Sequence, residues 1–189
     1  MQFPELLLAS KSPRRHQLLG DSGFRFTYVE IDAEEDFADH LVKQEVCEYL
    51  AAHKAAHFKG EIGNKVLVTA DTIVVLNNEI INKPVDFEHA FEMLKKLSGK
   101  MHEVYTGVCL KNDLKQLVFS ERTEVYFHPL TDDEIKFYID NYKPYDKAGA
   151  YGVQDWMGYV GVEKVNGCFY NVMGFPVARF YRELQKFIS

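Results

Sequence analysis

The stretch that decides the fold class is Glu5-Leu6-Leu7-Leu8-Ala9-Ser10-Lys11-Ser12-Pro13-Arg14-Arg15. Its first half is a short apolar run that ends at a serine, which is typical of a buried strand. Its second half indicates the start of a helix. Ser12 can cap free backbone N–H groups, and Pro13 suits the first helical position because its missing donor would be unpaired there anyway. The stretch therefore predicts a strand that passes directly into a helix.

Strands and helices continue to alternate along the rest of the chain. Strands are expected at 24–31, 65–76, 79–81, 102–111, 116–128 and 159–165, and helices at about 41–58, 86–97, 131–141 and from 176 onward. In the long helix, Val42, Val46, Tyr49 and Leu50 lie at helical spacing. Hairpins interrupt the alternation in the middle of the chain, one of them at the turn signal Asn77-Asn78. Asp86 can cap the helix that follows, and Thr131 with Glu134 three residues later has the pattern of a capping box. The pattern predicts an α/β fold with a mixed sheet flanked by helices, and we expect one domain over residues 1–189.

The bulk properties exclude several classes of protein. A net charge of −6 over 189 residues argues against a general nucleic-acid binder, which would normally carry a basic face. No window approaches the ~18 apolar residues of a membrane span, and the N-terminus lacks the pattern of a signal peptide. The three cysteines are widely spaced and form no CxxC pair, so neither a disulfide framework nor a zinc site is indicated. We therefore expect a cytoplasmic protein with reduced thiols.

The turn from the first strand into the first helix is a candidate phosphate site. A helix start offers unpaired N–H groups and the positive end of the helix dipole. Arg14 and Arg15 add forked donors that match phosphate oxygens. At ideal helical spacing the two side chains point about 100° apart, so both need not serve one ligand. The alternative is a capped surface helix with solvated arginines.

Asp71 is the second candidate, because it interrupts the Val- and Ile-rich run of residues 66–75. Burying a charge there is costly unless a cation or hydrogen bonds compensate it. A metal ligand or a general base would explain it, and so would a strand-end aspartate bonded to neighbouring backbone. Lone charged residues such as Lys54, Lys83 and Glu35 carry no weight alone. His53 and His57 lie four apart, but no third metal ligand accompanies them.

Taken together, these residues resemble the Maf family of nucleoside triphosphate pyrophosphatases, the septum-formation-inhibitor-like proteins. The motifs that carry the resemblance occur in order over most of the chain. They are Leu8–Arg15, Ala70-Asp71-Thr72-Ile73-Val74, Asn82-Lys83-Pro84-Val85-Asp86, Leu97–Val108, Asp146–Gln154 and Asn171-Val172-Met173-Gly174-Phe175-Pro176.

The resemblance implies an elongated α/β fold with a deep cleft between two lobes, often as a homodimer. It implies hydrolysis of a nucleoside triphosphate to the monophosphate and pyrophosphate, supported by Mg²⁺ or Mn²⁺. By motif, Asp71 is the proton acceptor and a metal ligand, Lys54 and Lys83 are phosphate-side lysines, and Glu35 matches an acidic residue near the metal. Arg14, Thr72 and Gln154 match positions tied to substrate choice. Ser10, Ser12 and Arg15 complete the expected substrate-binding set.

The segment Asp146–Gln154 resembles the branch of the family that acts on dTTP and UTP. A glutamine amide has both a donor and an acceptor, so it can recognise a pyrimidine edge. Asp155 and Trp156, however, stand where many members of that branch have glycine and a smaller residue. The implied role is nucleotide-pool cleansing or arrest of cell division. The alternative is a non-catalytic, nucleotide-binding regulator of cell division on the same fold.

Overall fold

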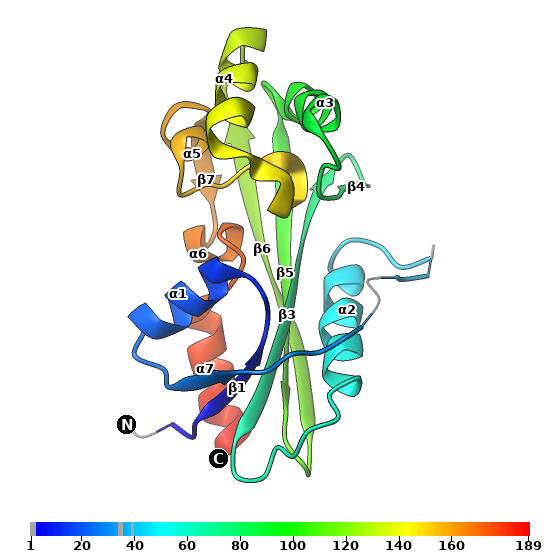
Figure 1. Cartoon of the computed structure of the whole chain (residues 1–189), viewed down its shortest axis with the longest axis vertical. Coiled ribbons are helices and arrows are strands. Elements are labelled where there is room, and N and C mark those ends of the chain that lie inside the picture. The colour runs from blue at the N-terminus through cyan, green and yellow to red at the C-terminus, as the bar shows by residue number, and fades with distance from the viewer. Residues whose placement is uncertain (1–2, 34–35, 39) are drawn as a thin grey trace. The chain divides into compact units, whose positions relative to one another are not determined.

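The structure is a computed structural model that describes residues 3–33, 36–38 and 40–189 (Figure 1). In chain order its elements are β1 (Leu6–Ala9), α1 (Pro13–Asp21), β2 (Phe26–Tyr28), α2 (Gln44–Ala56), β3 (Val66–Leu76), β4 (Glu79–Ile81), α3 (Phe87–Leu97), β5 (Met101–Lys111), β6 (Gln116–Phe127), α4 (Asp132–Tyr142), two 3₁₀ turns (Pro144–Asp146 and Ala148–Ala150), α5 (Trp156–Val160), β7 (Val162–Asn166), α6 (Phe169–Val172) and α7 (Val177–Ile188). The described part of the chain has no helix that is both long and apolar enough to cross a membrane.

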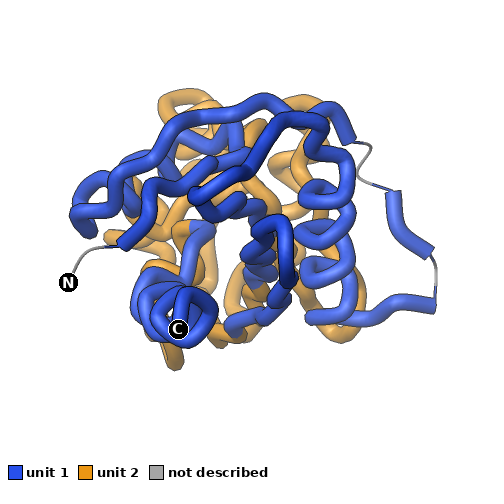
Figure 2. The backbone as a smooth tube through the Cα atoms, turned by 90° about the horizontal axis from the view of Figure 1, so that it is seen from below, with its two compact units in different colours: residues 1–71, 106–121, 174–189 blue, residues 72–105, 122–173 orange. Residues whose placement is uncertain are grey.

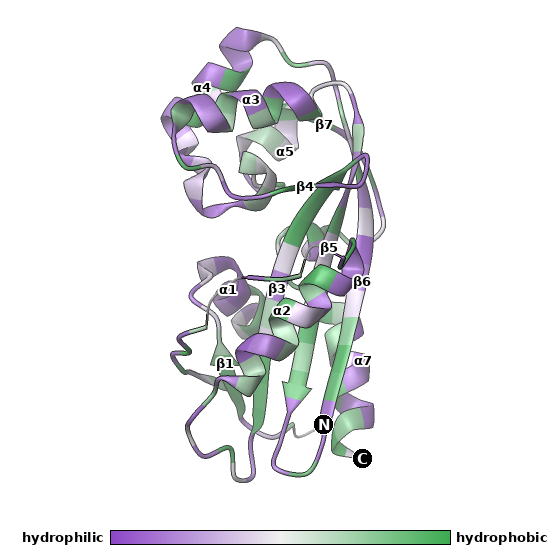
Figure 3. Cartoon of the chain, turned by 90° about the vertical axis from the view of Figure 1, so that its right-hand side faces the viewer, coloured by the Kyte–Doolittle hydropathy of each residue, from purple (hydrophilic) through white to green (hydrophobic). Residues whose placement is uncertain are grey.

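The strands form one mixed sheet in the order β2-β1-β3-β5-β6-β7, with β4 paired to β3 outside this path. β1 runs parallel to both neighbours, so Leu7 lies opposite Thr27 on β2 and Leu67 on β3. β4 is antiparallel to β3, and β7 is antiparallel to β6. Figure 3 shows that hydrophobic residues concentrate in the strands. The prediction of an α/β fold with a mixed sheet is confirmed.

The chain divides into two compact units, coloured separately in Figure 2. The first comprises residues 1–71, 106–121 and 174–189. In this unit α2 lies on one side of β1 and β3, and α7 lies on the other (Figure 1). The core beneath α2 is a cluster of small and aliphatic side chains: Leu7, Ala9, Ala51, Ala55, Ile62, Leu67 and Cys109. Alanines on α2 let the helix approach the sheet closely.

The second unit comprises residues 72–105 and 122–173. Its core contains a cluster of three rings. His102, Phe127 and Tyr151 meet edge to face, with ring centroids 4.9 to 5.4 Å apart. Helix α4 contributes Tyr138, which is completely buried. Part of the aromatic content of the sequence thus fills the interior of this unit.

The predicted helix caps are confirmed for two helices and wrong for one. The carboxylate of Asp86 accepts a hydrogen bond from the His89 N–H at 2.8 Å at the start of α3. Thr131 and Glu134 form the expected capping box at the start of α4. Ser12 occupies the cap position of α1 but makes no side-chain cap bond. Its own backbone N–H donates instead to the hydroxyl of Ser10, at 3.3 Å.

Three other predictions need correction. The strand expected at 24–31 is only Phe26–Tyr28. The strand expected at 159–165 begins at Val162, because the residues before it close the short helix α5. Helix α2 begins at Gln44, and Val42 and Tyr49 are 60% and 42% exposed, whereas Val46 and Leu50 are buried as expected. An apolar residue at helical spacing is therefore not always turned inward.

Candidate active site

The loop between β1 and α1 is organised around Ser10 and Arg15. The hydroxyl oxygen of Ser10 accepts hydrogen bonds from the Ser12 N–H and from Arg15 Nη1, the latter at 3.1 Å. The same guanidinium donates from Nη1 to the carbonyl of Ala70 and from Nε to the carbonyl of Gly174, both at 2.8 Å. Arg15 thus ties this loop to β3 and to the segment that leads into α7.

These contacts decide between the two interpretations of the loop for one arginine. The alternative of a capped helix with solvated arginines is wrong for Arg15, which is half-buried and bonded to three protein acceptors. Arg14 is also half-buried. Whether Arg14 and Arg15 bind a substrate stays a prediction.

His16 belongs to the same loop and was missed by sequence reasoning. Its Nε2 lies 2.5 Å from the carbonyl oxygen of Ser10. Because a carbonyl only accepts, Nε2 carries the hydrogen and donates it. The ring also packs against Phe26 and Tyr28 of β2, with centroids 5.6 Å apart. A single histidine outside any motif gave no signal for this role.

Strand β3 carries Asp71 on the face that α2 covers. Side chains alternate along a strand, so Leu67, Thr69 and Asp71 share this face. The Thr69 hydroxyl donates to the carbonyl of Ala51 at 2.6 Å, and Lys54 Nζ donates to Asp71 Oδ1 at 2.6 Å. The side chains of Lys54 and Asp71 are only 16% and 12% exposed. The charge of Asp71 is thus compensated by a cation, which comes from α2. Whether Asp71 is a metal ligand or a general base stays a prediction.

Two of the cysteines are poor candidates for a covalent nucleophile. Burial, with the charge of Asp71 as the next cause, raises the pKa of the Cys47 thiol. Burial raises the pKa of Cys109 to about 11. A thiol is a nucleophile only as the thiolate, so both side chains are inert at neutral pH.

Three more of the predicted residues belong to the second unit. Thr72 directly follows Asp71 in β3 and is half-buried. Lys83 is exposed in the loop after β4. Gln154 precedes α5, and its side-chain oxygen Oε1 is buried without a hydrogen-bond partner among the described residues. Buried amide oxygens are normally satisfied, so Gln154 Oε1 is an acceptor that is open to a donor.

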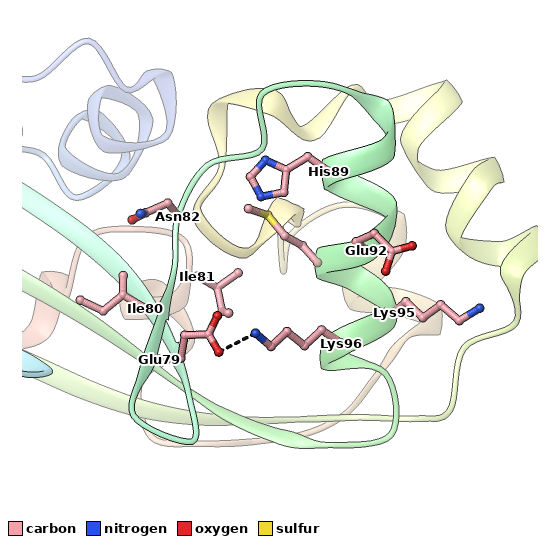
Figure 4. Close-up of a pocket in the computed structure, with 9 residues that line it drawn as sticks. Glu79, Ile80, Ile81, Asn82, His89, Glu92, Lys95 and Lys96 are labelled. Atoms are coloured by element: carbon pink, nitrogen blue, oxygen red, sulfur yellow. Dashed lines mark hydrogen bonds and ion pairs between the residues drawn. The ribbon is translucent and has the colours of Figure 1, made fainter.

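The second unit also contains a pocket of about 560 Å³ between β4 and α3 (Figure 4). Its lining combines aliphatic and charged side chains: Glu79, Ile80, Ile81, Asn82, His89, Glu92, Met93, Lys95 and Lys96. The Lys96 ammonium donates to the Glu79 carboxylate at 2.5 Å across it. None of the predicted site residues lines this pocket.

The predicted metal ligands can be only partly located. Glu35 lies outside the described residues. Within residues 3–33, 36–38 and 40–189 no group of three or more His, Cys, Asp or Glu side chains is arranged to hold a metal ion. His53 and His57 lie side by side, with ring centroids 4.2 Å apart. Of the two predicted metal ligands, Asp71 is the one that the structure describes.

Comparison with known proteins gives the family. The family model described as Maf-like protein matches residues 5–187. The chain belongs to the Maf-like family. The resemblance drawn from six sequence motifs is thereby confirmed.

Relatives of this Maf-like protein match along almost its whole length. A protein of Cytophaga hutchinsonii named dTTP/UTP pyrophosphatase is 45% identical, over 98% of this chain and 85% of that protein. Proteins with the same name from Bacteroides thetaiotaomicron and Porphyromonas gingivalis are 43% and 42% identical, over 96% and 97% of this chain and 95% and 94% of those proteins. A solved HAM1 protein from Coxiella burnetii matches 66% of this chain and 73% of its own, with a TM-score of 0.43 and 12% identity, too distant to carry an argument.

Proposed function

We propose that this Maf-like protein is a nucleoside triphosphate pyrophosphatase that hydrolyses dTTP and UTP to the monophosphate and pyrophosphate. The names of its relatives support the activity and the two substrates. The observation in this chain that carries the proposal is the buried pair of Asp71 and Lys54, with Nζ and Oδ1 2.6 Å apart. It combines a proton acceptor with a phosphate-compatible cation in a mostly dry environment.

Asp71 is the proposed proton acceptor. A carboxylate held in a partly dry site can orient a water molecule and take its proton as the water attacks phosphorus. Lys54 compensates the charge of the carboxylate. An ammonium group has three donors, so bonding to Asp71 does not prevent Lys54 from binding a phosphate oxygen of the substrate. The reaction needs no covalent enzyme nucleophile.

The phosphates and the base are assigned to the other predicted residues. We assign the triphosphate to Arg14, Lys83 and the loop of Ser10 and Ser12, since about four negative charges must be offset for a water molecule to attack. Arg15 holds that loop through its contacts with Ser10, Ala70 and Gly174, and its binding of phosphate is a further proposal. Thr72 and Gln154 are assigned to recognition of the substrate.

A divalent cation, Mg²⁺ or Mn²⁺, fits the donor set. Mg²⁺ is usually held by one or two carboxylates together with phosphates of the substrate, so no cluster of protein ligands is required. Asp71 would hold it, with Glu35 as a second carboxylate. When bound, the cation supplies neutralisation of charge on the phosphates.

Further proposals concern the protein in the cell. We infer a cytoplasmic homodimer whose chain acts as a single domain, and a role in nucleotide-pool cleansing or in arrest of cell division. The competing proposal is a regulator of cell division that binds nucleotides without turning them over. The intact Asp71 and Lys54 pair favours the enzyme, because binding alone does not require a buried proton acceptor.

The test is a product-resolved assay with dTTP, UTP, dCTP, dATP and dGTP in the presence of Mg²⁺ or Mn²⁺. Phosphorus NMR should show dTMP and pyrophosphate from dTTP, and UMP and pyrophosphate from UTP, faster than products from the other three. The appearance of dTDP and orthophosphate would refute cleavage between the α- and β-phosphates. Tight nucleotide binding with no product would favour the regulator.

A further inference from the structure

A hydroxyl group buried in the second unit holds the segment that carries Gln154. Tyr138 of α4 is completely buried. Its hydroxyl oxygen accepts a hydrogen bond from the Gly152 N–H at 3.0 Å and donates to the Asp155 carboxylate, with both oxygens at 3.1 Å. Burial and then the charge of Asp155 raise the pKa of Tyr138. The hydroxyl therefore remains a donor at working pH.

Asp155 occupies the cap position of α5 but does not cap the helix with its side chain. It is the residue before α5, where an aspartate would normally accept from the first N–H groups of the helix. Its side chain makes no cap bond to α5. The carboxylate instead faces Tyr138, so it joins the start of α5 to α4.

The geometry at Gly152 connects this pair to Gln154. A Cβ atom at Gly152 would lie 2.5 Å from Asp155 Oδ2 and 3.2 Å from Gln154 Nε2. The carboxylate and the amide of Gln154 thus both pack over the glycine. Gln154 Oε1 is buried and lacks a hydrogen-bond partner among the described residues. An amide held in this way with one unsatisfied acceptor is arranged to accept a hydrogen bond from a ligand.

We propose that Tyr138 and Asp155 are positioning residues for base recognition: through Gly152 they fix Gln154 so that its Oε1 accepts from an N–H of the pyrimidine. The inference rests on the proposed function and assigns a role to Asp155, the residue at which this chain departs from many members of the branch. Thymine and uracil present the N3–H donor that Oε1 requires, whereas N3 of cytosine is an acceptor. Neither positioning residue needs to touch the substrate.

The test is equilibrium binding of the α,β-imido analogues of dTTP and dCTP in Mg²⁺ buffer, measured by calorimetry on the full chain. The quantity is the ratio of the two dissociation constants, which reports base discrimination without turnover. Gln154→Ala should reduce the preference for the dTTP analogue about tenfold, the effect of losing one hydrogen bond. Tyr138→Phe and Asp155→Ala should each reduce it several-fold, and Asp155→Asn, which keeps an acceptor for Tyr138, should retain most of it.

Non-additivity separates positioning from a direct contact. In a Gln154→Ala background, Tyr138→Phe and Asp155→Ala should reduce the preference no further. Tyr126→Phe is the matched control, because it removes a hydroxyl that donates to Glu124 in the same unit, at 2.9 Å, and it should leave the preference unchanged. If Tyr138→Phe does not fold, Asp155→Ala and Asp155→Asn carry the same comparison.

The outcomes that overturn the proposal are distinct. An unchanged preference in Tyr138→Phe and Asp155→Ala, or additive losses with Gln154→Ala, would refute positioning through Gln154. A loss in Asp155→Ala that persists without Gln154, with Tyr138→Phe unaffected, would mean that Asp155 contacts the base itself. A wild-type protein that binds the dTTP analogue no better than the dCTP analogue would refute the proposed substrate choice together with this inference.

Discussion

Lys54 and Asp71 depend on each other for stability as well as for the proposed chemistry. Removing one partner of a mostly buried ion pair leaves a charge without compensation, which typically costs about 3 kcal/mol or more. Lys54→Met should therefore lower the free energy of unfolding by about 3 kcal/mol in a urea titration. Adding Asp71→Asn should recover part of that loss, because the uncompensated charge is then gone.

The control for this buried pair is a lysine–aspartate pair that lies on the surface. Lys95 and Asp132 lie 3.0 Å apart, with both side chains 53% exposed. Exposed pairs contribute at most about 1 kcal/mol, so Lys95→Met should change the free energy of unfolding by less than that. Equal effects of the two substitutions would contradict the burial argument.

His102 gives a prediction about pH. Burial lowers its pKa from 6.5 to about 3. Between these two pH values the unfolded chain binds a proton at His102, whereas the folded chain does not. Where the unfolded state binds more protons, stability rises with pH. The contribution of His102 is thus complete above about pH 6.5 and is lost progressively as the pH falls toward 3.

The measurement is the free energy of unfolding between pH 7 and pH 4, for the wild type and for His102→Gln. We expect the wild type to lose about 1 kcal/mol more per pH unit than the variant between pH 6 and pH 4. Parallel pH profiles would show that His102 is not held neutral by burial.

At the level of single residues, the sequence indicated which charge needs compensation but not which contact supplies it. Asp71 stood out because a charge within a run of valines and isoleucines demands compensation, but nothing in the spacing pointed to Lys54 on a helix 17 residues earlier. Arg15 and Arg14 looked equivalent in sequence. Only the three-dimensional positions of Ala70 and Gly174 show why Arg15 is bonded to backbone carbonyls.

The helix caps make a prediction at the level of elements. Thr131 makes both bonds of a capping box with Glu134, whereas Ser12 makes no side-chain cap bond. Thr131→Ala should lower the free energy of unfolding by about 1 kcal/mol. Ser12→Ala should lower it by only a few tenths, because no cap bond is lost. Thermal or urea unfolding of the two variants compares them directly, and a larger loss in Ser12→Ala would contradict the assignment.

Elements were predictable from sequence where a local signal fixes the backbone. Asn77 and Asn78 form the expected turn with φ of 51° and 69°, a conformation that asparagine tolerates better than most residues. The errors fall where apolar residues have no such signal. Tyr159 and Val160 look like strand residues, but they are exposed at the end of α5.

At the level of the molecule, the alternation of strands and helices predicted the α/β class, and six motifs predicted the family. The strand order was not predictable, because local patterns do not encode which distant strands pair. For the candidate site, the motifs named residues but gave no contacts between them. The structure shows that Lys54 donates to Asp71 and that Arg15 is bonded within its loop. The expected cleft between two lobes stays a prediction.

The measurement that tests the central claim most directly is the steady-state rate of dTTP hydrolysis by Asp71→Asn beside the wild type, with pyrophosphate release followed in Mg²⁺ buffer. Asparagine has nearly the same shape but cannot accept the proton of the attacking water. We predict that kcat falls about 100-fold or more, while circular dichroism shows an unchanged fold. A folded Asp71→Asn protein that releases pyrophosphate at the wild-type rate would contradict the account.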